Sequence, residues 1–234
     1  MPPPPRKRPE RTGPEDDYTA EPFLPAEGRR GKAGLDDLRR AAARCRGCPL
    51  HRDATQTVFG EGDSGARVLL LGEQPGDQED RRGEPFVGPA GRVLDRALEE
   101  AGIDPAQSYV TNAVKHFKWE YASGGRGKRR IHKAPNLREM TACGPWLAAE
   151  LALVAPEVIV VLGATAGKAL FGSSFRVTKQ RGALIEQDVH GRSERVVATI
   201  HPSAVLRADD RDREAVREGL VSDLRVAAGA LRGS

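Results

Sequence analysis

Short apolar runs recur along the chain, separated by longer stretches in which apolar residues return with helical spacing. Three runs predict parallel strands that are buried on both faces: residues 67–71, 109–114 and 158–162. A fourth run, residues 195–200, predicts either one arm of a hairpin with residues 180–189 or a fourth parallel strand. The chain therefore has the strands for a mainly parallel sheet.

Helical periodicity occupies most of the sequence between these runs. Helices are predicted over residues 35–44, 90–101, 136–153, 164–170 and 208–231. Strands that alternate with helices predict an α/β fold, here a three-layer α/β/α sandwich on a four-stranded, mainly parallel sheet. Residues 33–234 are expected to form this single domain. Residues 1–32 hold 8 of the 17 prolines and few apolar residues, so they predict a disordered tail.

Polar segments follow three of the predicted strands. In such sheets ligands bind beyond the carboxyl ends of the strands, so these segments are expected to meet at one site. They are residues 72–76 (GEQPG), residues 112–118 and residues 201–207 (HPSAVLR). His201 at this edge is placed to polarise a bound carbonyl group. Taken singly, each segment also fits an ordinary polar turn or a structural histidine.

Charge is unevenly distributed. The 234 residues contain 37 Lys and Arg against 33 Asp and Glu, a net charge of +4. Residues 115–133 alone hold seven basic residues and one acidic residue, a net charge of +6. Phe117, Trp119 and Tyr121 lie among these charges, which favours a phosphate backbone with stacked bases, although a charged run also fits a solvated surface. No apolar stretch is long enough for a membrane span or a secretory signal, so a cytoplasmic protein is expected.

Three cysteines, Cys45, Cys48 and Cys143, suggest metal chemistry because a C-x2-C pair in a reducing compartment is rarely a disulfide. A four-coordinate site needs one more ligand, and His116, just after the second strand, is the best candidate. The site is then either zinc held by three cysteines and a histidine or an iron–sulfur cluster with one histidine ligand. Three unrelated buried cysteines are the remaining alternative.

Several segments together resemble the UdgX-type uracil-DNA glycosylases, relatives of the family 4 iron–sulfur uracil-DNA glycosylases. They are residues 72–76 (GEQPG), 128–132 (KRRIH) and 201–207 (HPSAVLR). Residues 84–91 (EPFVGPAG) and 111–115 (TNAVK) resemble the family's stretches that carry a uracil-stacking aromatic residue and a uracil-reading asparagine. The resemblance extends from about Leu35 to Leu231.

The resemblance implies a role for each matching residue. Uracil would be extruded from DNA, stacked on Phe86 and read by Asn112, and His132 would then attack the anomeric carbon and stay bonded to it. The implied catalytic residues are His132, Glu73, His201, Gln74 and Arg130. The implied uracil-binding residues are Gly72, Phe86, Asn112, Gln74 and His201. The implied DNA-binding residues are Lys128, Arg129, Arg130, Ser203 and Arg207.

The resemblance also implies a cofactor and a partner. The cofactor is a [4Fe–4S] cluster held by Cys45, Cys48, His116 and Cys143, with zinc as the alternative. Ordinary family 4 enzymes have a cysteine where this chain has His116. The expected partner is uracil-containing DNA, preferably single-stranded, bound by a nucleoid-associated monomer that does not contact membranes.

Two other functions remain open. The first is an ordinary, hydrolytic family 4 uracil-DNA glycosylase with multiple turnover. The second is a non-catalytic iron–sulfur protein that binds damaged or single-stranded DNA. A zinc-dependent deaminase is disfavoured because its H-x-E and P-C-x-x-C pattern is missing.

Overall fold

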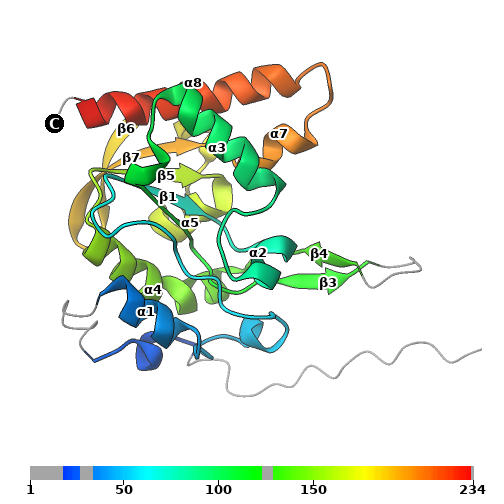
Figure 1. Ribbon diagram of the computed structural model, residues 1–234, viewed down its shortest axis with the longest axis vertical. Helices are drawn as coiled ribbons and strands as arrows, with labels where there is room; N and C mark the ends of the chain where they lie inside the picture. The colour runs from blue at the N-terminus through cyan, green and yellow to red at the C-terminus, as the bar shows by residue number, and fades with distance from the viewer. Residues whose placement is uncertain (1–17, 27–33, 123–128, 233–234) are drawn as a thin grey trace, which may run out of the picture.

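A computed structural model describes residues 18–26, 34–122 and 129–232. At its centre is a five-stranded sheet with the strand order β2-β1-β5-β7-β6 (Figure 1). Its strands are β1 (Val68–Gly72), β2 (Ser108–Asn112), β5 (Val158–Leu162), β6 (Leu184–Val189) and β7 (Arg192–Thr199). The first four strands in the spatial order are parallel, and β6 pairs antiparallel with β7. The prediction of four strands was thus one short, because the last apolar run both continues the parallel sheet and forms the hairpin.

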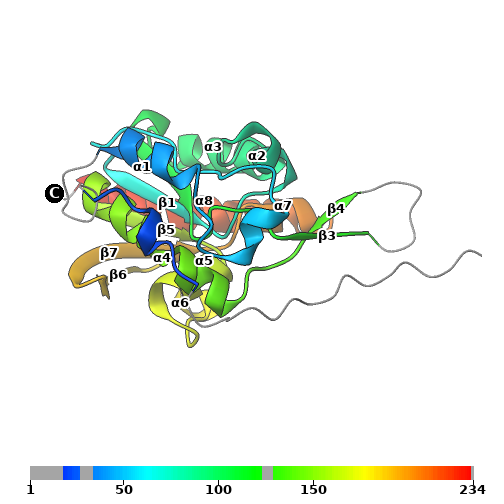
Figure 2. The same cartoon turned by 90° about the horizontal axis from the view of Figure 1, so that it is seen from below.

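Helices cover both faces of the sheet, which gives three layers (Figures 1 and 2). They are α1 (Leu35–Ala42), α2 (Asp77–Arg82), α3 (Pro89–Ala101), α4 (Leu137–Val154), α5 (Ala164–Phe171), α6 (Val177–Gln180), α7 (Ser203–Arg207) and α8 (Arg213–Arg232). Single 3-10 turns span Glu21–Phe23, Pro49–Arg52 and Pro105–Gln107. Along β1, Val68 and Leu70 pack towards α3 and α8, whereas Leu69 and Leu71 pack towards α4 and α5. This alternation, with every β1 residue buried, is the reason that the strand reads as one apolar run.

The long connection after β2 contains a second, two-stranded sheet. Strands β3 (Trp119–Tyr121) and β4 (Arg130–His132) pair antiparallel, with Trp119 opposite His132. The β3–β4 hairpin projects from the body of the molecule beside α2 (Figures 1 and 2). This segment was expected to be a loop, and the hairpin is a finding of the structure. Lys128, one of the predicted DNA-binding residues, lies outside the described residues.

Part of the predicted tail is folded. Residues 18–26 pack beside α1 and α4, where the Ala20 N–H donates to the Ala142 carbonyl at 2.8 Å and Leu24 is buried. The expectation of a disordered tail is therefore wrong for this stretch, because its few apolar residues cover a core cluster. Residues 1–17 and 27–33 lie outside the described part of the chain. Among the described residues, none of the helices has the length and apolar character needed to cross a membrane.

Candidate active site

A pocket of about 770 Å³ opens at the carboxyl edge of the parallel strands. Its walls include side chains from all three polar segments that follow strands and from β4 of the hairpin. Those with predicted chemical roles are Glu73, Gln74, Phe86, Asn112, His132, His201, Ser203 and Arg207. Segments far apart in the sequence meet here because parallel strands end at one edge of the sheet.

Gly72 brings two of these side chains together. It ends β1 directly opposite Asn112 at the end of β2. A Cβ atom on Gly72 would lie 2.3 Å from Asn112 Oδ1 and 2.7 Å from Cζ of Phe86, so only glycine allows this approach. Asn112 is 3% exposed. Because Gly72 has no side chain, the Asn112 amide and the Phe86 ring can approach each other above its backbone.

Phe86 has an unusual backbone conformation, with a φ of 56°. A bulky residue in this left-handed region stores backbone strain that the surrounding structure must hold. Its ring faces the His201 ring, with 6.1 Å between centroids and 29° between planes. Phe86 is therefore held as one flat wall of the pocket.

Glu73 and His132 face each other at the pocket. Their closest atoms, Glu73 Oε1 and His132 Nε2, are 3.5 Å apart. Glu73 Oε1 is buried and has no hydrogen-bond partner among the residues that the structure describes. A buried, unpaired carboxylate oxygen is costly in a folded protein and usually marks a functional site. It is suited to a ligand that carries or develops positive charge.

His132 is half-exposed at the end of β4, next to the ring of Phe117. Burial lowers the pKa of His132 below its ordinary value of 6.5, and the positive charge of Arg207 acts in the same direction. The Glu73 carboxylate opposes this shift but does not reverse it. The imidazole is therefore neutral at neutral pH, with a nitrogen lone pair available for attack.

His201 is held in one protonation state by its neighbours. Burial lowers its pKa to about 4 and the charge of Arg207 adds to the shift, so the ring is neutral. The Ser203 N–H donates to His201 Nδ1 at 3.1 Å, and the Ser203 hydroxyl lies 2.6 Å from the same nitrogen. Arg207 donates to Ser203 Oγ at 2.7 Å. Because Nδ1 accepts, the proton sits on Nε2, which leaves Nε2–H as a donor for a ligand.

Gln74 lines the pocket, but its amide bonds to the backbone of the β3–β4 hairpin. Nε2 donates to the carbonyls of Lys118 and Lys133, and Oε1 accepts the Lys118 N–H at 3.0 Å. The side chain therefore joins the base of the hairpin to the end of β1. This geometry agrees with the predicted orienting role, and it commits the amide to protein contacts.

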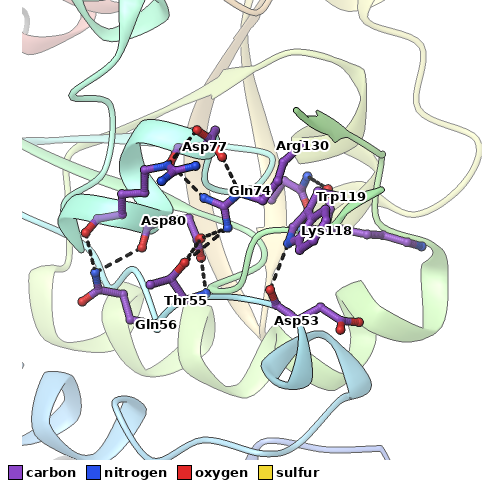
Figure 3. Close-up of polar contacts among 10 residues, drawn as sticks. Asp53, Thr55, Gln56, Gln74, Asp77, Asp80, Lys118, Trp119 and Arg130 are labelled. Atoms are coloured by element: carbon purple, nitrogen blue, oxygen red, sulfur yellow. Dashed lines mark hydrogen bonds and ion pairs between the residues drawn. The ribbon is translucent and has the colours of Figure 1, made fainter. Parts of the chain in front are cut away.

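Arg130 lies inside the protein, with a side chain only 10% exposed (Figure 3). Its guanidinium donates to Asp77 and Asp80 on α2 and to Thr55 Oγ1. The rings of Phe117 and Trp119 lie 5.3 and 5.4 Å from it. Arg130 thus clamps β4, and with it His132, to the first helix after GEQPG. So placed, its guanidinium is engaged with protein side chains.

Internal pairing uses much of the basic charge of residues 115–133. Lys115 is fully buried, with Nζ bonded to Glu150, Thr111 Oγ1 and the Asn112 carbonyl. Lys118 pairs with Glu139 on α4, and Lys133 pairs with Glu120 on β3. Among the described basic residues of this segment, Arg129 and Lys133 are exposed.

Sequence reasoning missed three groups that hold the site: Thr55, Asp77 with Asp80, and the Lys115–Glu150 pair. The two aspartates had a visible signal, since they follow GEQPG at helical spacing. Thr55 and Glu150 had none, because their partners are distant in the sequence.

The three cysteines are buried in one apolar cluster with Trp146. Burial raises the pKa of Cys48 to about 11 and that of Cys143 to about 12, and the nearby thiols add to both shifts. His116 Nε2 lies 3.0 Å from Thr57 Oγ1. Across residues 18–26, 34–122 and 129–232, no three or more His, Cys, Asp or Glu side chains are arranged to hold a metal ion. The three thiols share one buried cluster, but the four predicted ligands do not form a metal site as placed.

Comparison with known proteins identifies the family. The sequence model of the uracil DNA glycosylase superfamily matches residues 59–225. The chain is similar to a type-4 uracil-DNA glycosylase of Thermotoga maritima, with 38% identity over 165 residues, covering 70% of this chain and 79% of the relative. A type-4 uracil-DNA glycosylase of Archaeoglobus fulgidus is 33% identical over 195 residues, covering 82% and 90% of the two chains. A type-5 uracil-DNA glycosylase of Thermus thermophilus is 35% identical over 117 residues, covering 48% and 53%. The chain therefore belongs to the uracil-DNA glycosylase superfamily.

Proposed function

We propose that the protein excises uracil from DNA and stays covalently bound to the resulting abasic sugar through His132. The observation that carries this proposal is the close approach of His132 Nε2 to Glu73 Oε1, 3.5 Å apart, at the pocket that Asn112 and Phe86 also line. Membership of the superfamily and the type-4 relatives support the excision of uracil. The position of a neutral histidine beside an unpaired carboxylate supports the covalent step.

In this proposal the deoxyuridine leaves the base stack and its uracil enters the pocket. Uracil stacks on the Phe86 ring. The Asn112 amide, which carries both a donor and an acceptor, pairs with uracil O4 and N3–H, whereas cytosine offers the opposite pattern. His201 donates a hydrogen bond from its Nε2–H to O2, where negative charge gathers as the base departs.

The glycosidic bond between C1′ and uracil N1 then breaks, and its electron pair leaves with the base. Positive charge develops on the sugar, and the buried carboxylate of Glu73 stabilises it. The His132 Nε2 lone pair forms the new bond to C1′ from the tautomer that is protonated at Nδ1. The resulting imidazolium loses its Nδ1 proton to solvent, and the uracil anion takes up a proton.

The adduct is expected to persist for two reasons. Once the Nδ1 proton is lost, the bonded ring can leave only as an imidazolide anion, which is a poorer leaving group than the uracil anion, so the reverse of the second step is slow. In addition, Gln74 and Arg130 fix both ends of the short segment that carries His132, so the ring stays at the sugar. Each protein molecule would then act once.

The second candidate function is ordinary hydrolysis with repeated turnover. The similarity to type-4 enzymes favours it. In that case His132 would orient a water molecule, and abasic DNA would be released. A non-catalytic DNA-binding protein is the third possibility, and it would liberate no uracil at all.

One experiment separates these functions. The protein is incubated with an end-labelled, uracil-containing single-stranded oligonucleotide, and the products are resolved on a denaturing gel. We expect a protein–DNA band that survives denaturation, and its loss in His132→Ala. His190→Asn, which alters an exposed histidine in the turn between β6 and β7, is the matched control and should cross-link normally. Abundant abasic DNA without such a band would contradict the covalent step.

We further propose that Cys45, Cys48, His116 and Cys143 hold a [4Fe–4S] cluster, with zinc as the alternative. The gathering of the three thiols in one buried cluster supports this proposal. His116 would have to exchange its contact with Thr57 for the metal. The role proposed for the cluster is structural, joining the segment after α1 to α4, and no step of the reaction passes through it.

A further inference from the structure

Glu79 is a buried carboxylate beside the pocket that the proposed mechanism does not use. It lies on α2, and its Oε1 accepts the main-chain N–H of Gly88 at 2.8 Å. Gly88 is the N-cap of α3, so this one bond ties α2 to the start of the next helix.

Two glycines make room for this carboxylate. A Cβ atom on Gly76, the N-cap of α2, would lie 2.5 Å from Glu79 Oε2. A Cβ atom on Gly88 would lie 2.8 Å from Oε1. The carboxylate is thus enclosed between the starting residues of two helices, a close fit that any other side chain at either position would disturb.

The segment that Glu79 spans contains Phe86. It begins at Gly83, whose N–H donates to the Glu79 carbonyl, and it ends at Gly88, whose N–H donates to the Glu79 side chain. Both ends of the loop are therefore fixed to one residue. Between them Phe86 has its unfavourable φ of 56°, and a Cβ atom on Gly91 would collide with the Phe86 carbonyl oxygen.

We propose that Glu79 is a positioning residue that holds Phe86 in its strained conformation, ready to stack on the extruded base. The proposal rests on the stacking role proposed above for Phe86. Without the bond to Gly88, the loop relaxes towards ordinary backbone angles and the ring leaves the pocket wall. Glu79 itself does not touch the reacting atoms.

The test is single-turnover excision of uracil from a single-stranded oligonucleotide with protein in excess, which gives a maximal rate and a half-saturating concentration. Phe86→Ala is expected to lower the maximal rate about tenfold, the value of one stacked base. Glu79→Ala should lower it similarly, and Glu79→Gln, which keeps the acceptor oxygen, should restore it. The double variant should have the same maximal rate as Phe86→Ala alone, because the effects of coupled residues are not additive.

Controls separate positioning from loss of structure. Glu99→Ala removes an exposed carboxylate from α3 and should leave the rate unchanged. Thermal unfolding is followed for every variant. If Glu79→Ala does not fold, Glu79→Asp takes its place, because it keeps the charge but is one methylene too short to reach Gly88.

Two results would overturn this inference but not the stacking role of Phe86. The first is a slow rate in Phe86→Ala together with a normal rate in Glu79→Ala. The second is a double variant in which the rate reductions of the two single variants multiply. A normal rate in Phe86→Ala would overturn both this inference and the stacking role on which it rests.

Discussion

At the scale of single residues, the pocket is arranged for charges that develop on the substrate only during the reaction. Glu73 presents an unpaired oxygen, and both pocket histidines, His132 and His201, are held neutral by burial. A neutral histidine serves as a nucleophile through its lone pair and as a hydrogen-bond donor through its single proton. The Glu73 carboxylate is thus the counter-charge for a cationic sugar, whereas the anionic base is met by a neutral donor, His201.

The pH dependence of cross-linking follows from the lowered pKa of His132. The reactive imidazole is neutral, and its pKa in the folded protein lies below 6.5. The rate should therefore still exceed half of its plateau value at pH 6.5 and should fall to half only at a lower pH, as the pH drops through the lowered pKa. Single-turnover cross-linking rates from pH 8.5 to below pH 6.5 provide the check. A rate already halved at pH 6.5 would show an unshifted histidine.

Gly72 offers a second test at this scale. Gly72→Ala places a methyl group 2.3 Å from Asn112 Oδ1 and against the Phe86 ring, so both uracil contacts must move. We expect about a 100-fold slower excision, because small misplacements of a reacting group have effects of that size. Gly102→Ala is an unsuitable control because of its positive φ, whereas Gly144→Ala has open space and should be silent.

Sequence patterns predicted that these residues would meet, because polar segments after parallel strands share one edge of a sheet. They did not predict the φ of Phe86, the tautomer of His201 or the commitment of Gln74 to the hairpin backbone. The Gln74 contacts join residues distant in the chain, which local patterns do not show. The His201 tautomer depends on Ser203, two residues away, and a residue pattern does not give the hydrogen-bond geometry that sets it.

At the scale of elements, the β3–β4 hairpin carries His132, the nucleophile of the proposed mechanism. Its strands have three residues each, too short to give a periodic signal, so the sequence predicted only a long loop. What makes it ordered is its attachment: Gln74 at its base, Arg130 against α2, and Trp119 Nε1 donating to the Asp53 carbonyl at 2.9 Å (Figure 3). Helix α2 escaped prediction for the same reason, since six mostly charged residues have no apolar period.

Variants of Arg130 test whether this residue attaches the hairpin to α2 or binds DNA. Arg130→Gln leaves the buried Asp80 without its cation, so we expect a loss of about 3 kcal/mol in the free energy of unfolding and a much slower cross-link. The salt dependence of DNA affinity should keep its slope, because the guanidinium contacts protein. Arg129→Gln, at the exposed neighbour, should lower the slope by about one. An equal change of slope in both variants would place Arg130 on the phosphate backbone.

At the scale of the whole molecule, the sandwich could be predicted almost completely. Buried parallel strands read as apolar runs, and the helices between them read as periodic stretches. The overall charge was more misleading. The +6 of residues 115–133 suggested an open basic surface, yet Lys115, Lys118 and Arg130 pair with acidic side chains from other segments. A count of charges does not show which of them are paired internally.

The cysteine cluster makes its own prediction at this scale. Protein purified without oxygen should contain about four iron atoms and as many sulfide ions per chain. His116→Ala should lose the cluster and its visible absorption, whereas His116→Cys should keep both. His51→Ala, at a neighbouring histidine whose Nδ1 contacts the Cys48 carbonyl, is the matched variant and should retain iron. Zinc without sulfide, or full iron in His116→Ala, would contradict this ligand set.

The central claim is that each protein molecule acts once, and the stoichiometry of uracil release tests it most directly. Protein is mixed with a large excess of uracil-containing single-stranded DNA, and free uracil and cross-linked protein are measured over time. The proposed mechanism predicts that uracil release stops at one molecule per protein molecule and equals the amount of cross-linked protein at every time point. Continued release of uracil well beyond one equivalent, with unmodified protein remaining, would contradict it.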